Sequence, residues 1–256
     1  MINNYISYYP KFEHGLYTDL INLQNEWERG LEKLDPTTSQ LFVYDGIVPY
    51  YTEQPFKILF IGKESLEVAG VNYVIDILKN CYNANRIGGK TLNAYRFHAI
   101  MCYVAYGINR NFSEYKDLPW AQEIGADFGN EGGISFAFMN ISKFSNESGL
   151  WQADIPLIQK FLGLTKCLNT NYFEKEIELI NPDLIIGMNL KSWYGCIGKI
   201  NGPLKNFGGC VDYYQLHTQY NQYPLLDSWH FSAPKKRAEK DYYIPITSAV
   251  KYVFNI

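Results

Sequence analysis

Four short apolar segments, far apart along the chain, each run into polar residues, and this pattern constrains the fold more than any other feature. The segments span residues 57–65, 134–142, 182–189 and 224–234. Short, continuous apolar runs are typical of strands that are covered on both faces, as in a parallel sheet. Ligands of open α/β sheets bind beyond the carboxyl ends of such strands. We therefore expect one shared pocket to receive the polar residues at these ends, which are Glu64, Asn140, Asn189 and His230.

Segments with helical periodicity alternate with these strands, and the alternation predicts a parallel sheet with helices on both faces. The expected helices span residues 17–34, 66–83, 91–106, 148–161, 172–180 and 235–253. Residues 42–51 are expected to form an extended connector, and the residues from the third strand to Ile200 a helix or a loop.

The sequence thus predicts an α/β fold, namely a three-layer α/β/α sandwich around a four-stranded, mostly parallel sheet. We expect a single domain over residues 1–256, with an N-terminal helical extension at 1–54 and a core at 55–256. Hydrophobic residues make up 47% of the chain, which at this length is enough for one sizeable core.

Composition limits the partners and cofactors that we expect. The net charge is −3, so a nucleic-acid partner would need a local basic patch, and the dense basic cluster at residues 235–240 directly follows the fourth strand. The five cysteines are dispersed without a CxxC pair, which argues against a disulfide framework, a zinc ribbon or an iron–sulfur cluster. The sequence shows neither a secretory signal nor an apolar run long enough to span a bilayer. We expect a cytoplasmic monomer with no membrane partner, no cofactor and no metal.

Three of the segment ends, taken in order, resemble motifs of the uracil-DNA glycosylase superfamily. The motifs are Gly62-Lys63-Glu64-Ser65, Phe138-Met139-Asn140 and His230-Phe231-Ser232-Ala233-Pro234. The resemblance covers residues 57–240 and departs from the family's pattern at Glu64, where several members have Asp, and at Phe231, where Pro is usual. It implies an enzyme that cleaves the N-glycosidic bond of a base flipped out of DNA. Some members of the family carry an iron–sulfur cluster, for which this chain lacks clustered cysteines.

The resemblance also implies roles for individual residues. Cleavage of an N-glycosidic bond places positive charge on the sugar and negative charge on the departing base. Glu64 would stabilise the sugar cation or orient a water, and His230 would donate a hydrogen bond to the leaving base. Asn140 would read the base edge, because its amide offers both an acceptor and donors. The other substrate-binding candidates are Gly62, Lys63, Ser65 and Ser232, and the phosphate-binding candidates are Lys235, Lys236 and Arg237.

Each of these residues also has a plain structural interpretation. Ser65 can cap the following helix, Asn140 can form a turn at a strand end, and His230 can be a satisfied core histidine. The basic cluster can be the solvated first turn of a helix. Three functions therefore stay open: a glycosylase acting on single- or double-stranded DNA, a non-catalytic binding module for nucleic acid, a nucleotide or a protein, and a hydrolase of free nucleosides.

Two further patterns carry less weight. Residues 84–91 match a loose phosphate-loop pattern, but a helix is expected before them instead of the required strand, which favours a loop between helices. Metal-ligating residue types occur at Asp212, His217, Asp227 and His230, but their spacing matches no recurrent metal motif.

Overall fold

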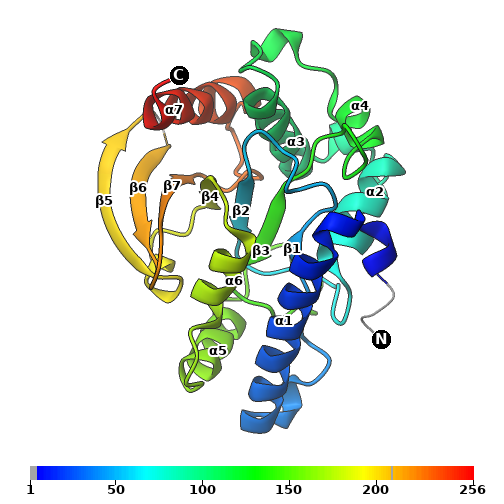
Figure 1. Cartoon of the computed structure of the whole chain (residues 1–256), viewed down its shortest axis with the longest axis vertical. Coiled ribbons are helices and arrows are strands. Elements are labelled where there is room, and N and C mark those ends of the chain that lie inside the picture. Colours follow the sequence, from blue (N-terminus) through cyan, green and yellow to red (C-terminus); the bar gives the residue numbers. More distant parts are fainter. Residues whose placement is uncertain (1–4, 209) are drawn as a thin grey trace.

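A computed structural model describes residues 5–208 and 210–256, and its architecture is α/β, with a mixed sheet of seven strands (Figure 1). The order of strands across the sheet is β1-β3-β2-β4-β7-β6-β5. Their bounds are β1 (Gly46–Ile47), β2 (Ile58–Gly62), β3 (Ala137–Asn140), β4 (Leu184–Met188), β5 (Lys199–Asn206), β6 (Asp212–His217) and β7 (Gln222–Ser228).

Four neighbouring strands at the centre of this sheet, β3, β2, β4 and β7, are parallel. They arise from the four apolar segments of the sequence, and every residue of β2, β3 and β4 is buried. In register, Gly62 at the end of β2 pairs with Asn140 at the end of β3, and Met188 of β4 pairs with Ser228 of β7. The carboxyl ends of the four strands consequently meet at one edge of the sheet.

The expectation of a four-stranded sheet is wrong, because three antiparallel strands extend it. β1 pairs with β3 within the expected connector, while β6 and then β5 add to β7 on the opposite side. The outermost strand β5 is almost entirely exposed and contains Gly202 and Pro203, so it lacks the apolar pattern that marks a buried strand. β6 is buried on one face only, through Tyr214 and Leu216.

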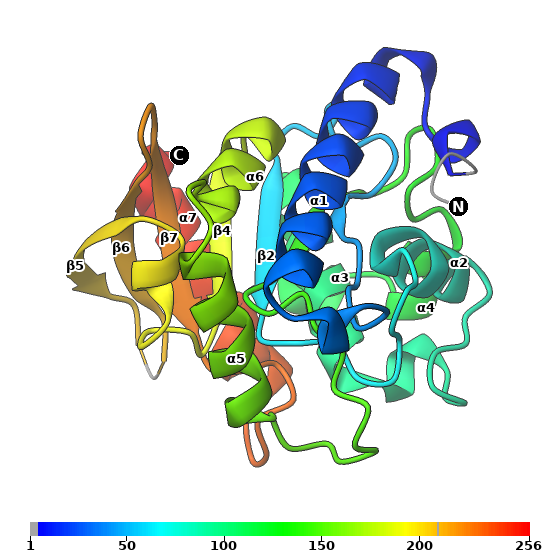
Figure 2. The ribbon, with the colours of Figure 1, turned by 90° about the horizontal axis from the view of Figure 1, so that it is seen from below.

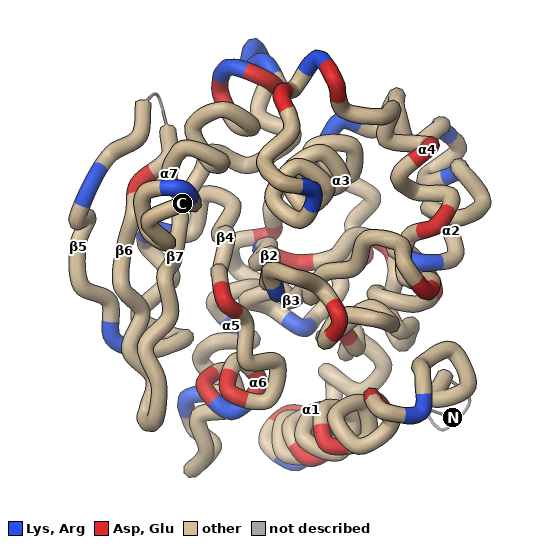
Figure 3. Tube along the Cα trace, turned by 45° about the horizontal axis from the view of Figure 1, so that its top comes forward, with Lys and Arg blue, Asp and Glu red and all other residues tan. Residues whose placement is uncertain are grey.

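Helices cover both faces of the sheet, with α1, α5 and α6 on one face and α3 and α7 on the other (Figures 2 and 3). The seven α-helices of the described residues are α1 (His14–Leu34), α2 (Asn80–Asn83), α3 (Arg96–Asn109), α4 (Ala121–Ala126), α5 (Ile155–Lys166), α6 (Tyr172–Ile180) and α7 (Ile244–Phe254). None of the helices in the ranges 5–208 and 210–256 combines the length and apolar character that a bilayer span requires.

Three helices begin later than the sequence periodicity indicates, and each correction changes the surroundings of the site. The segment expected at 66–83 becomes helical only at Tyr73–Lys79, as a π-helix that continues into α2. Helix α5 begins at Ile155, with the Asp154 side chain as its cap and a proline in its first turn, so residues 148–153 form a loop. The last helix begins as the π-helix Ala238–Tyr243, which leaves the basic residues 235–237 in the loop before it.

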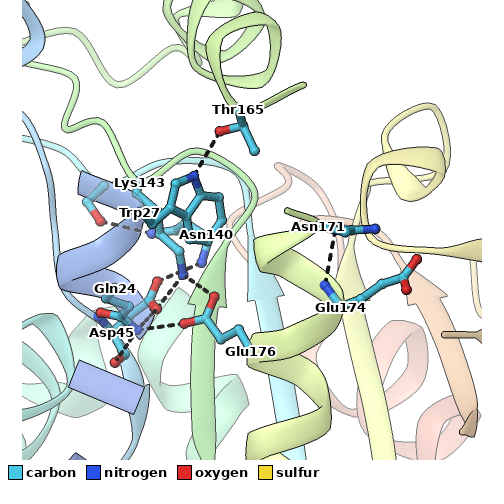
Figure 4. A network of polar contacts seen from close by, with 10 residues as sticks. Gln24, Trp27, Asp45, Asn140, Lys143, Thr165, Asn171, Glu174 and Glu176 are labelled. Carbon is cyan, nitrogen blue, oxygen red and sulfur yellow. Dashed lines mark hydrogen bonds and ion pairs between the residues drawn. The ribbon is translucent and has the colours of Figure 1, made fainter. Parts of the chain in front are cut away.

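A buried ionic cluster connects helices α1 and α6 with the loops beside strands β1 and β3 (Figure 4). Lys143 Nζ lies 2.5 Å from Asp45 Oδ1 and 2.8 Å from Glu176 Oε2, and the three side chains are almost completely buried. Gln24 of α1 completes the cluster by donating a hydrogen bond of 2.6 Å to Glu176 Oε1. Burial raises the pKa of Asp45 well above its usual value, against the attraction of Lys143. The cluster connects α1, the chain before β1, the chain after β3 and α6.

Replacing Lys143 by Met should lower the free energy of unfolding by about 3–5 kcal/mol, because two buried carboxyl groups lose their counter-charge. Urea denaturation measures the change as a shift of the midpoint at constant slope. The matched control is Lys160→Met, which removes an exposed ion pair with Asp35 and should leave the midpoint nearly unchanged. Equal midpoint shifts for the two variants would show that the buried cluster contributes no more to the free energy of unfolding than the ion pair of Lys160 with Asp35 does.

Candidate functional site

A cavity of about 310 Å³ lies at the carboxyl ends of β2, β3 and β7. Seven of the site residues expected from the sequence line it together: Gly62, Lys63, Glu64, Ser65, Asn140, His230 and Ser232. Residues from three segments, separated by up to 170 positions, thus meet in one hollow. This is the arrangement that ligand binding at the edge of a parallel sheet requires.

Asn140 is fixed at the floor of the cavity by three contacts. Its backbone N–H donates to Asp45 Oδ2 at 3.0 Å, and its side-chain Nδ2 donates to Ser65 Oγ at 2.9 Å. Its Oδ1 lies against Gly62, where a Cβ would stand only 2.4 Å from that oxygen. The glycine therefore allows the amide to lie directly on the end of strand β2.

Glu64 is held by the loop that precedes α5. Its Oε1 accepts a 2.8 Å hydrogen bond from the backbone N–H of Asp154, while its Oε2 is buried without a hydrogen-bond partner among the described residues. Burial is the main cause that raises the pKa of this carboxyl above its usual value, and the Asp154 amide and the charge of Lys63 partly oppose it. One oxygen of the carboxylate is thus anchored and the other is unsatisfied.

The same loop forms one rim of the cavity. Asn146 Oδ1 accepts a hydrogen bond from Ser148 N, and Asn146 Nδ2 donates to Gln152 O. Between these anchors, Leu150 and Trp151 line the cavity although they are 63% and 77% exposed. Large apolar side chains that are exposed beside a pocket mark a surface available to a ligand.

His230 faces the cavity with a fixed ring. The ring stacks on Phe97 at a centroid distance of 5.1 Å, and Nδ1 lies 2.6 Å from Ser232 Oγ and 3.4 Å from Ser232 N. Burial, followed by the charge of Lys63, lowers the pKa of His230 to about 4, so the imidazole is neutral near pH 7. Because the amide of Ser232 can only donate, its contact favours the tautomer with the proton on Nε2.

An aromatic wall of the cavity was not identified from the sequence. It comprises Tyr73, Tyr95, Phe97, His98 and Phe138, of which Tyr95, Phe97 and His98 come from the start of α3. Trp151 lies 6.2 Å from the Tyr95 ring, and Tyr73 stacks on Phe138 at 5.0 Å. The segment YRFH at residues 95–98 was the available signal, because it places three rings within four positions of a helix start.

The other expected contributors lie outside the cavity lining. Asn189 ends β4 but is exposed, with a left-handed backbone. Lys235, Lys236 and Arg237 do not line the cavity; Lys236 Nζ lies 4.7 Å from the Trp229 ring, and Arg237 N donates to Asp241 Oδ2. Arg96 Nη1 holds their loop by donating to the carbonyl of Ala233.

Neither the phosphate-loop-like segment at residues 84–91 nor the scattered residues of metal-ligating type form a site in the described part of the chain. Residues 84–91 follow helix α2 and turn at Gly88 and Gly89, which both have positive φ, so no strand leads into them as a phosphate loop requires. Across residues 5–208 and 210–256, no three side chains of metal-ligating type gather as a metal site would require.

Replacing Gly62 by Ala should displace the Asn140 amide and lower the free energy of unfolding by about 1–3 kcal/mol, because the new Cβ overlaps Oδ1. The double variant Gly62→Ala/Asn140→Ala removes this overlap. Its loss in free energy of unfolding should therefore be smaller than the sum of the losses in Gly62→Ala and in Asn140→Ala. Gly163→Ala in α5 is the control, since nothing lies within 4 Å of its Cβ position. Chemical denaturation of the four variants tests the coupling, and strict additivity would contradict it.

Comparisons of the chain with protein-family models, with curated proteins and with solved structures found no match. What the cavity does must therefore be inferred from its own side chains.

Proposed function

We propose that this chain is a uracil-DNA glycosylase-like hydrolase that cleaves the N-glycosidic bond of a base extruded from DNA. The observation that carries the proposal is the meeting of Glu64, Asn140 and His230 in one cavity at the ends of parallel strands. A carboxylate, an amide and a neutral imidazole supply the three functions that such a cleavage needs. The carboxylate would stabilise the sugar cation, the amide would bind the base edge, and the imidazole would donate a hydrogen bond to the leaving base.

Glu64 would act on the sugar side. As the bond between the anomeric carbon and the base nitrogen breaks, both electrons leave with the base and the sugar becomes cationic. The unpartnered Oε2 of Glu64 would stabilise this cation and orient the water whose oxygen then bonds to the anomeric carbon. The proton that this water loses would pass to the departing base anion, which is released as the neutral base. The hydrogen bond from Asp154 N to Oε1 would keep the carboxylate in place during this step.

His230 would act on the base side. With Nδ1 engaged by Ser232, the Nε2–H group is free to donate to a carbonyl oxygen of the base as negative charge develops there. A neutral donor suits this role, because its proton stays in place at physiological pH. Asn140, held by Ser65 and Asp45, would contact the base edge. The rings of Phe97 and Tyr95 would pack against the flat base.

Nucleic acid would approach along the rim. Leu150 and Trp151 offer exposed apolar surface at the mouth, and Lys63 is a cation within the cavity lining. Lys235, Lys236 and Arg237 lie on the exposed loop that follows Ser232, from which they would contact phosphates. As part of the same proposal, we describe the fold as a three-layer sandwich built on the four central parallel strands.

A second candidate, hydrolysis of free nucleosides, is favoured by the charges beside the rim loop. Glu67 and Glu147 are exposed there, with Glu67 Oε1 close to Gly149, and Asp154 ends the loop. Lys and Arg are interspersed with Asp and Glu along the chain trace instead of forming one long basic stripe (Figure 3). Such a rim repels a polyphosphate chain, whereas a nucleoside carries no phosphate.

Glu64→Gln and His230→Ala should each reduce base release from uracil-containing single-stranded DNA, by about 100–10,000-fold and about 100–1,000-fold respectively. The matched controls are Glu131→Gln and His217→Ala, which alter side chains outside the cavity lining and should leave the rate nearly unchanged. Release of the base is measured by alkaline cleavage of the abasic product. DNA binding that weakens with salt, without base release, would instead support a binding module, and turnover of nucleosides without DNA affinity would support the second candidate.

The pH dependence of kcat/KM should follow Glu64. The carboxylate must be ionised to stabilise the cation, and burial raises its pKa, so the rate should rise with pH through a midpoint above 4.5. His230 has a pKa of about 4 and is already neutral above that midpoint, so it should cause no loss of activity between pH 6 and 8. A pH–rate profile of the wild type and of Glu131→Gln tests this, and a rate that falls as pH rises from 4 to 6 would contradict the assigned role.

A further inference from the structure

His98 is a second histidine in the wall of the cavity, and the function proposed above leaves it unused. It lies in the first turn of α3, is only 4% exposed, and contacts the rings of Tyr82, Tyr95 and Phe97. Phe97 also stacks on the ring of His230. Burial lowers the pKa of His98 to about 3, so this ring is neutral at physiological pH.

The proton of this neutral ring is placed by Tyr82. The Tyr82 hydroxyl lies 2.7 Å from His98 Nδ1, and Tyr82 is completely buried. No other acceptor among the described residues receives the hydroxyl hydrogen, and a buried hydroxyl seldom leaves its hydrogen unpaired. The hydroxyl therefore donates to Nδ1, which places the imidazole proton on Nε2. Within residues 5–208 and 210–256, that Nε2–H has no protein partner, on a ring that forms part of the cavity wall.

The cavity lining consequently includes two neutral imidazoles, His98 and His230, each with Nδ1 engaged by the protein and with no partner for Nε2–H among the described residues. When a ligand displaces water from the cavity, a donor in its lining favours a ligand that brings an acceptor and disfavours one that brings another donor. His98 cannot accommodate a donor by changing its tautomer at no cost, because the tautomer with the proton on Nδ1 would leave the Tyr82 hydroxyl without an acceptor.

We propose that His98 is a specificity-determining residue that selects bases with a carbonyl oxygen, against bases with an amino group, at the edge that meets its Nε2–H. The inference rests on the proposed function and adds to it the chemical class of base. An oxo base such as uracil satisfies the donor, whereas the amino group of cytosine at the same position places donor against donor. Recognition built on a hydrogen bond can discriminate strongly, because the wrong ligand leaves buried groups unpaired.

The test uses three free pyrimidines as inhibitors of base release by the full chain: uracil, 2-pyrimidinone, which lacks the 4-oxo group, and cytosine. For the wild type, uracil should inhibit most strongly and cytosine least. In His98→Phe, which keeps an aromatic ring but loses the donor, inhibition by uracil should weaken about 10–100-fold. Inhibition by 2-pyrimidinone and cytosine should change less than threefold.

Tyr82→Phe is the second variant, because it keeps the packing of the ring but releases the His98 tautomer. The ratio of the inhibition constant of cytosine to that of uracil should then be about tenfold smaller than in the wild type. Nitrogen-15 NMR should show His98 as a mixture of tautomers instead of the Nε2–H form alone. Tyr9→Phe is the control, since it also removes a buried tyrosine hydroxyl, which donates to the carbonyl of Ile47 outside the cavity lining.

The outcomes separate this inference from the function on which it rests. A wild-type protein that neither releases uracil nor is inhibited by it overturns the proposed function and the inference with it. A wild type that releases uracil, while His98→Phe and Tyr82→Phe keep the original order and ratios of inhibition, overturns the role of His98 alone. A His98 that NMR shows protonated on Nδ1 in the wild type also overturns it. Unfolding midpoints show whether each variant is folded.

Discussion

The site depends on a buried lysine far from solvent. Lys143 neutralises Asp45, and Asp45 in turn accepts the backbone N–H of Asn140, the residue at the floor of the cavity. Without a counter-charge, the buried carboxylate of Asp45 would take up a proton or move toward water, and Asn140 would lose an acceptor. Glu176 and Gln24 extend this dependence to α6 and α1. The N-terminal helix therefore supports the position of Asn140 at the end of β3 although it does not line the cavity.

Burial also sets the protonation of the groups that line the cavity. It raises the pKa of Glu64 and lowers those of His98 and His230, so each group is pushed toward its neutral form. For the histidines this yields neutral donors, whose second nitrogens are occupied by Tyr82 and Ser232. The hydrogen bond from Asp154 and the nearby charge of Lys63 keep the carboxylate of Glu64 accessible to ionisation. Perturbed pKa values that cluster in one pocket are frequent at functional sites.

The sequence predicted the part of the fold that is buried most uniformly. Continuous apolar runs identified the four central strands. Of the polar residues at their ends, Glu64, Asn140 and His230 share a cavity, whereas Asn189 does not. The exposed strand β5 and the two-residue strand β1 escaped detection, because pairing at a sheet edge needs few apolar residues. Tyr95, Phe97 and His98 were missed for a different reason: within a helix that is otherwise part of the core, periodicity does not distinguish a ring facing a cavity from a ring facing the core.

The hydrogen bond between Glu64 and the amide of Asp154 has a mechanical consequence. It fastens the Glu64 carboxyl group to the end of the segment that carries Leu150 and Trp151, the exposed side chains at the rim of the cavity. A displacement of this loop would therefore also displace the Glu64 carboxylate, so the position of the rim and the orientation of the carboxylate are coupled through one hydrogen bond.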